Sequence, residues 1–162
     1  MYLNDPAVTA ARFSHIRIDN SMSDSLPNFQ IQGIDIQEIS IKQPEGNLGR
    51  NPNLNFNIHL DHAVMQENQL FIVGTTITTH AQENQLLATY KANCVFRIEN
   101  MGQYATGDEK GGVSLPEELM SMLNSISVST TRGLMYGGFA GTYLQKVVLP
   151  VIDTDAFALN KG

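Results

Sequence analysis

The sequence predicts an α+β domain, in which a four-stranded antiparallel sheet packs against one long and one short C-terminal helix. Two observations lead to this fold class. Four segments with the alternating, β-branched pattern of strands come first, and a segment with helical spacing follows only after the last of them. Strands that precede helices in this way are typical of α+β domains. We expect residues 1–28 to form an N-terminal extension and residues 29–162 to form the domain.

The first predicted strand spans residues 29–41, and its alternation slips twice. Its apolar side chains fall into three pairs, and the middle pair is out of phase with the other two: Phe29 and Ile31, Ile34 and Ile36, Ile39 and Ile41. Gly33 stands at the first slip. A β-bulge there would re-aim the side chains that follow.

Residues 43–53 hold two prolines and two glycines, which excludes regular structure. This stretch is long for a hairpin turn, so we expect it to cross over the sheet. Three further strands are predicted at residues 53–62, 70–78 and 86–98, and the first of them alternates most cleanly. We expect these three strands to form a meander. The crossover joins the first strand to this meander, and the four strands form one sheet.

The pentapeptide QENQL occurs twice, at residues 66–70 and 82–86. Both copies lie between consecutive predicted strands, one strand and one turn apart. We therefore expect two similar hairpin turns rather than a functional repeat.

A helix is predicted from Ser114, which together with Glu117 forms a capping box. Apolar residues at helical spacing line one face: Leu119, Met122, Leu123 and Ile126. The next residues have weak helix propensity and continue the helix only where packing supports it. We expect the helix to end near Arg132-Gly133 in a glycine-rich exit loop, and Asp153 to cap a short last helix.

Composition narrows the possible function. The 162 residues are 42 % apolar, which is enough for the core of one domain. Sixteen acidic residues against ten basic ones give a net charge of −6, which argues against binding to nucleic acid or anionic membrane. One cysteine, no long apolar stretch and no signal-like N-terminus together predict a cytoplasmic protein.

Three sets of residues could carry chemistry, and each has a simpler explanation. His59 and His62 lie three apart on a predicted strand, so they point to opposite faces and cannot share a metal ion. Cys94 lies on the apolar face of its strand, which predicts a buried, inert thiol. Asp153 and Asp155 are better explained by a helix cap than by a catalytic pair.

The stretch STTRGLMYGGF, residues 129–139, combines hydroxyl groups, an arginine and glycines. A phosphate-binding loop needs its glycines before a helix, followed by Lys-Ser or Lys-Thr. Here the predicted helix comes first and no lysine follows the glycines directly. We therefore expect no enzyme activity, no metal and no cofactor.

The two ends of the domain resemble the SecB family of protein-export chaperones. VSTTRG and VVLPVIDTDAF stand where that family has "V-S-R-G-T-F" and "L-x-P-V-N-F-D-A-L-F". FQIQGIDIQEISIKQP is similar to the family's first strand, and LLATYKANCVFRI occupies the place of a later one. The resemblance covers residues 29–157 in unbroken order, with specific motifs at both ends and only a general pattern between them.

The resemblance implies an ATP-independent holdase that binds unfolded or precursor polypeptides and passes them to the SecA motor. It also implies subunits that pair through first strands and long helices, and two dimers that form a homotetramer. The implied client groove is formed by side chains of the crossover, the second strand, the long helix and the segment after it: Leu48, Leu54, Phe56, Met120, Met122 and Tyr143.

The implied SecA-docking face keeps an acid at Glu38 and a leucine at Leu87. Lys42 and Thr89, however, stand at two positions where the family carries acids. The alternative hypothesis is therefore a SecB-like chaperone dedicated to one partner, such as an antitoxin, and not coupled to SecA. A structural oligomer of the same fold without client binding is a third hypothesis.

Overall fold

The computed structural model describes residues 26–49, 52–107 and 113–152. The predicted N-terminal extension up to residue 25 and the predicted short helix from Asp153 lie outside the described residues.

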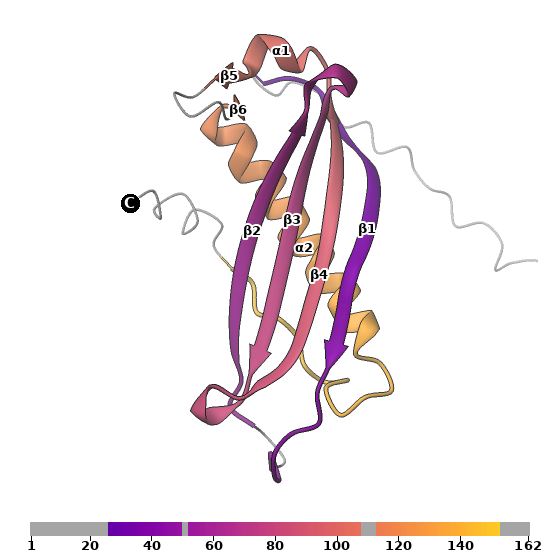
Figure 1. Cartoon of the computed structure of the whole chain (residues 1–162), viewed down its shortest axis with the longest axis vertical. Coiled ribbons are helices and arrows are strands. Elements are labelled where there is room, and N and C mark those ends of the chain that lie inside the picture. Colours follow the sequence, from indigo (N-terminus) through magenta and orange to yellow (C-terminus); the bar gives the residue numbers. More distant parts are fainter. Residues whose placement is uncertain (1–25, 50–51, 108–112, 153–162) are drawn as a thin grey trace, which may run out of the picture.

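Four antiparallel strands form one sheet: β1 (Phe29–Ile41), β2 (Asn55–Met65), β3 (Leu70–His80) and β4 (Leu86–Ile98). Their order in the sheet is β1-β4-β3-β2, so β1 and β2 are the two edges (Figure 1). The chain crosses from one edge to the other between β1 and β2, as the prolines and glycines there predict. The α+β class with a crossover and a meander is confirmed.

The two QENQL copies form the two hairpin turns at opposite ends of the sheet (Figure 1). Each contains a single 3-10 turn, η1 (Gln66–Asn68) and η2 (Gln82–Asn84). The backbones differ, because φ is positive at Gln69 in the first copy and at Glu83 and Asn84 in the second. The prediction of two hairpins is confirmed.

Strand β1 carries two bulges, between Ile31 and Gly33 and between Ile36 and Glu38. These are the positions of the two phase slips in the sequence. Each bulge adds one residue to β1. The apolar pair after a bulge therefore lies on the same face of the sheet as the apolar pair before it. All six apolar residues of β1 consequently pair with residues on the apolar face of β4: Ile98, Phe96, Cys94, Ala92, Tyr90 and Ala88.

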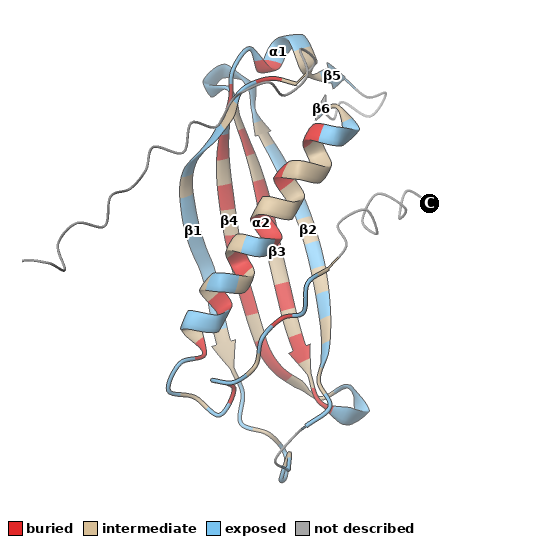
Figure 2. Cartoon of the chain, turned by 180° about the vertical axis from the view of Figure 1, so that it is seen from behind, coloured by how far each residue is buried: buried red, intermediate tan, exposed pale blue. Residues whose placement is uncertain are grey.

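Helix α2 (Glu117–Gly138) covers β3 and β4 on one face of the sheet (Figure 2). The predicted capping box is wrong: the N-cap is Pro116 and no side chain caps the helix. Ser114 belongs instead to the short strand β6 (Val113–Ser114), which pairs with β5 (Thr106–Gly107). These strands and helix α1 (Met101–Tyr104) connect β4 to α2.

The helix does not end at Arg132-Gly133 but continues to Gly138. Met135 is fully buried in the core, and this packing outweighs the weak helix propensity of the sequence. A Cβ atom on Gly138 would lie 2.9 Å from Cε2 of Tyr90, so the helix end is pressed against the sheet. Gly138 therefore serves close packing and does not belong to an exit loop.

The core lies between the sheet and α2 in two clusters, and Leu60 packs against both. Cys94 is fully buried, as expected. Burial raises the pKa of its thiol, and hydrogen bonds with Ser127 and Thr130 act in the opposite direction. No helix in the described part of the chain is long and apolar enough to cross a membrane.

Candidate functional site

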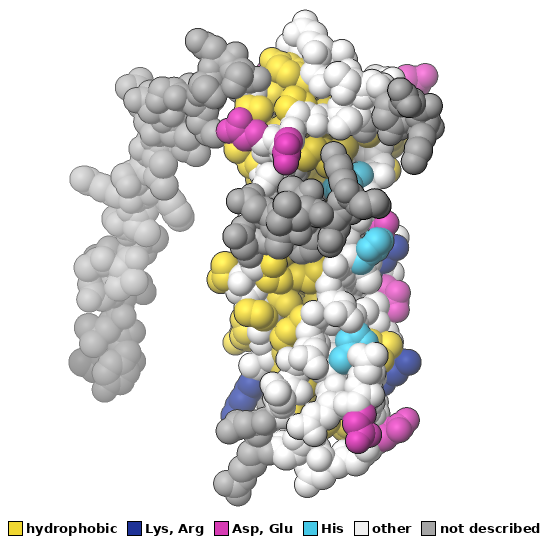
Figure 3. Space-filling model, turned by 90° about the vertical axis from the view of Figure 1, so that its left-hand side faces the viewer, with side chains coloured by type: hydrophobic (Ala, Val, Ile, Leu, Met, Phe, Trp, Pro, Cys, Tyr) yellow, Lys and Arg dark blue, Asp and Glu magenta, His cyan; other side chains and the backbone are white. Residues whose placement is uncertain are grey.

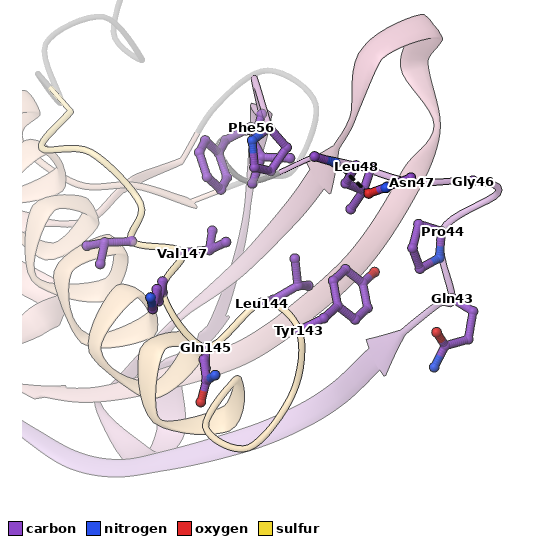
Figure 4. Close-up of a pocket in the computed structure, with 15 residues that line it drawn as sticks. Gln43, Pro44, Gly46, Asn47, Leu48, Phe56, Tyr143, Leu144, Gln145 and Val147 are labelled. Carbon is purple, nitrogen blue, oxygen red and sulfur yellow. Dashed lines mark hydrogen bonds between the residues drawn. The ribbon is translucent and has the colours of Figure 1, made fainter.

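A hollow of about 730 Å³ opens at the end of the sheet where β1 ends and β2 begins. Its walls come from three segments: the crossover between β1 and β2, the first residues of β2, and the chain after α2 (Figure 4). We call this hollow the crossover cavity. Residues 139–152, which follow α2, are called the strap, because they run back over the helix side of the sheet (Figure 2).

The strap is anchored by Leu144 and Leu149, which are both buried in the core. Between and beyond these anchors Val148 and Val151 are exposed. The hydroxyl of Tyr143 donates a hydrogen bond to the carbonyl of Lys42, which joins the strap to the end of β1. Partial burial raises the pKa of Tyr143, so its hydroxyl remains a donor at neutral pH.

Four of the predicted groove residues line this one cavity. Leu48 comes from the crossover, Leu54 directly precedes β2, Phe56 lies near the start of β2 on the helix side, and Tyr143 comes from the strap. Phe56 and Tyr143 lie 87 positions apart in the sequence, yet they line the same hollow (Figure 4). The fold therefore brings these four residues together from distant parts of the sequence. Their role in binding stays a prediction.

Met120 and Met122 do not belong to the cavity. They lie in the first two turns of α2, whereas the cavity is lined by the strap that follows its last turn. Met120 packs against the core cluster formed by Phe71, Phe96 and Leu123 among others. The methionines and the cavity are therefore at opposite ends of the helix.

Sequence reasoning missed the strap residues that complete the cavity. Leu144, Val147 and Val148 line it together with Tyr143, and Lys146 contributes the charge. The sequence carried a signal, because the short apolar run from Val147 to Val151 can cover a core without forming a helix or a strand.

The predicted SecA-docking residues do not form one accessible surface. Glu38 is exposed on the face of the sheet away from α2, opposite Lys91 of β4. Leu87 is fully buried, because the strand pairing shifts between Thr79 and His80 and makes it an extra residue in β4. Leu87 packs in the core and shares no exposed surface with Glu38, so a docking role for these two residues stays a prediction.

The helix side of β1 exposes a row of isoleucines. Ile31, Ile34, Ile36 and Ile39 are 43 to 48 % exposed. They lie on the same face as the buried residues of β4, but α2 covers chiefly β3 and β4 (Figure 2). Only the end of the helix reaches β1, where a Cβ atom on Gly138 would lie 3.7 Å from Cδ1 of Ile39. An edge strand with an uncovered apolar row is typical of an interface.

The two histidines of β2 point to opposite faces, as predicted. His59 lies with Nε2 3.0 Å from Oδ1 of Asp61 on the outer face. His62 lies on the helix side, with Nε2 2.8 Å from Oδ1 of Asn124. Among the described residues no three or more His, Cys, Asp or Glu side chains form a group that could hold a metal ion.

No protein-family model and no curated protein matches the sequence. Solved structures do match the fold, and one is the Rv1957 SecB-like chaperone of Mycobacterium tuberculosis in complex with a ChAD peptide from the Rv1956 HigA1 antitoxin. That match has 13 % sequence identity and a TM-score of 0.48, and it covers 77 % of this chain and 90 % of the other. A likeness at this level carries no functional conclusion.

Proposed function

We propose that this protein is a cytoplasmic, non-enzymatic chaperone that holds unfolded polypeptide segments without ATP. The observation that carries the proposal is the crossover cavity of about 730 Å³, which unites Leu48, Leu54, Phe56 and Tyr143. These are four of the residues that the resemblance to the SecB family indicates as a client groove.

The physical chemistry of the cavity suits this task. An unfolded client offers apolar side chains, and burial of one large side chain contributes roughly 1.5–3 kcal/mol. The cavity is of the size of pockets that accept such groups, which is about 300–1,000 Å³. Its crossover wall and strap contain little regular structure, so they can adjust to different side chains more readily than strands can.

The uncovered isoleucine row supports a homo-oligomer. We propose that two copies pair through β1 and α2, and that two such dimers form a tetramer. Pairing would remove Ile31, Ile34, Ile36 and Ile39 from water and would satisfy the open edge of β1. A second copy is a suitable occupant, because the same apolar row is then present on both sides of the interface.

Two forms of the chaperone hypothesis remain distinct. The first is a general export chaperone that passes precursors to SecA. The second is a dedicated chaperone of one partner, such as an antitoxin. The burial of Leu87, together with Lys42 and Thr89 at positions expected to be acidic, favours the second form.

A direct test is suppression of the aggregation of a chemically denatured client, measured by light scattering. We expect the wild-type protein to suppress aggregation at near-stoichiometric amounts, and the Phe56→Asp variant to lose this ability. Asn57→Asp is the matched control, because Asn57 is the next residue and points to the opposite face of β2. Failure of the wild type, or full activity of Phe56→Asp, would reject the proposal.

A second experiment separates the two forms of the hypothesis. A pull-down of denatured or nascent chains with SecA as competitor would reveal whether the motor displaces clients. The dedicated form expects tight capture of one partner and no competition by SecA. Broad capture of clients together with competition by SecA would support the export form instead.

A further inference from the structure

The charges around the crossover cavity are unevenly distributed. Lys146 of the strap is the only charged residue among the described residues that line it, and its side chain is exposed. Lys42 directly precedes the lining residue Gln43, and its carbonyl holds Tyr143. Lys42 itself does not line the cavity, so its contribution there is limited to this backbone carbonyl.

Two glutamates, one in the crossover and one in the η2 hairpin, line another hollow, although Glu45 stands between Pro44 and Gly46, which line the crossover cavity. Glu45 and Glu83 line a neighbouring cavity of about 320 Å³ that does not include Lys146. The two cavities share only residues of the crossover, among them Leu48 and Pro52. Lys146 and these two glutamates therefore line different cavities, which share part of the crossover.

A lysine at the edge of an apolar cavity discriminates between client segments. An apolar side chain that enters the cavity brings the adjacent residues of its chain to the rim. A carboxylate at the rim gains an ion pair with Lys146, an amide gains nothing, and an ammonium group is repelled. At physiological salt charges more than about 8 Å apart are largely screened, so a nearby lysine acts despite the negative net charge of the whole chain.

We propose that the crossover cavity selects apolar polypeptide segments flanked by Asp or Glu, and that Lys146 is the residue that sets this preference. The inference rests on the proposed function and specifies the chemistry of its client. It also sets the direction of the segment, with the acidic residue toward the strap and away from Glu45 and Glu83.

The test uses three short fluorescent peptides with one apolar core, flanked by Glu, Gln or Lys, and measures dissociation constants by fluorescence anisotropy. An exposed ion pair predicts that the Glu-flanked peptide binds about two- to fivefold more tightly than the Gln-flanked one. This advantage should disappear in Lys146→Gln and at high salt, and Lys146→Glu should favour the Lys-flanked peptide. Lys91→Gln, on the outer face of β4, is the matched control and should keep the advantage.

The Gln-flanked peptide distinguishes failure of this inference from failure of the proposed function. If it binds the wild type and not Phe56→Asp, the cavity is the client site. Equal binding of all three peptides, or an advantage that persists in Lys146→Gln, then overturns the role of Lys146 alone. If the Gln-flanked peptide does not bind, or binds Phe56→Asp equally well, the cavity is not the client site and both proposals fail.

Discussion

His62 of β2 and Asn124 of α2 face each other across the covered side of the sheet, with Nε2 of the histidine 2.8 Å from Oδ1 of the asparagine. The imidazole also lies against Phe71, with ring centroids 5.6 Å apart. This pair ties the end of β2 that lies away from the crossover cavity to α2, on the β2 side of the molecule that faces the viewer in Figure 3.

Asn124→Ala removes that tie. We expect a loss of about 0.5 kcal/mol in the free energy of unfolding, at the lower end for a hydrogen bond because both side chains are partly in water. Urea denaturation followed by circular dichroism measures it. Asn57→Ala on the outer face of β2 is the control and should lower the free energy of unfolding less. Equal effects of the two variants would show that the contact between His62 and Asn124 does not stabilise the fold.

Gly138→Ala should destabilise the protein, because the new methyl group would lie 2.9 Å from the Tyr90 ring. The expected cost is about 1–3 kcal/mol, as for other overpacked cores. Gly137→Ala is a close control, since its Cβ meets no atom within 4 Å and the substitution favours the helix. In thermal unfolding, the midpoint temperature of Gly138→Ala should therefore lie below that of the wild type, and the midpoint of Gly137→Ala above it. The reverse order would contradict the close packing of Gly138 against Tyr90.

Thr75→Val should stabilise the protein by about 1 kcal/mol, because a buried hydroxyl without a partner costs more than a methyl group of the same shape. The Oγ1 atom of Thr75 is buried and has no hydrogen-bond partner in the described residues. In Thr131→Val, by contrast, the lost hydroxyl donates to the carbonyl of Ser127 at 2.8 Å. Chemical denaturation of the two variants should show a gain only at position 75.

Ile36→Asp should break the proposed dimer, because pairing would bury a carboxylate in an apolar interface. The mass in solution, measured by light scattering after size exclusion, should fall toward that of one chain. Asp35→Asn changes the neighbouring residue on the outer face and should leave the mass unchanged. A wild-type mass for Ile36→Asp would exclude this row from the interface.

Cys94 predicts a pH dependence. Burial raises the pKa of its thiol above the unfolded value, so the folded state binds the proton more tightly. The contribution to stability is full below the unfolded pKa, near about 8.5, and is lost as the pH rises toward the folded pKa. Denaturation at increasing alkaline pH should show this decline in the wild type and a smaller decline in Cys94→Ala.

Much of the fold could be predicted because the spacing of apolar residues within a segment agreed with how the strands pair in the sheet. The two phase slips around Gly33 and Gln37 in β1 correspond to two bulges, and the QENQL copies form the hairpins. The burial of Leu87, a residue supplied by the resemblance, could not be predicted, because alternation within one strand does not reveal a register shift against its neighbour. The length of α2 was underestimated because Met135 and Gly138 are held by contacts with the sheet, which weak helix propensity does not indicate.

The candidate site was predictable only in part. Alternation placed Leu54 and Phe56 on one face of their strand, but only the resemblance assigned them, with Leu48 and Tyr143, to a groove. The remaining strap residues are held by the buried anchors Leu144 and Leu149, which are separated by four residues of irregular chain. Because this segment is neither a helix nor a strand, its buried residues follow no regular spacing from which burial could be predicted.

The order of the strands also constrains how the protein is made. Phe29 pairs with Ile98, so β1 has no partner in the sheet until β4, the last strand of that sheet, has been synthesised. The β2-β3-β4 meander can form from neighbouring residues, whereas β1 waits until the chain from residue 42 to residue 98 has been synthesised. During that interval the isoleucines of β1 are exposed to water and to other chains in the nascent polypeptide.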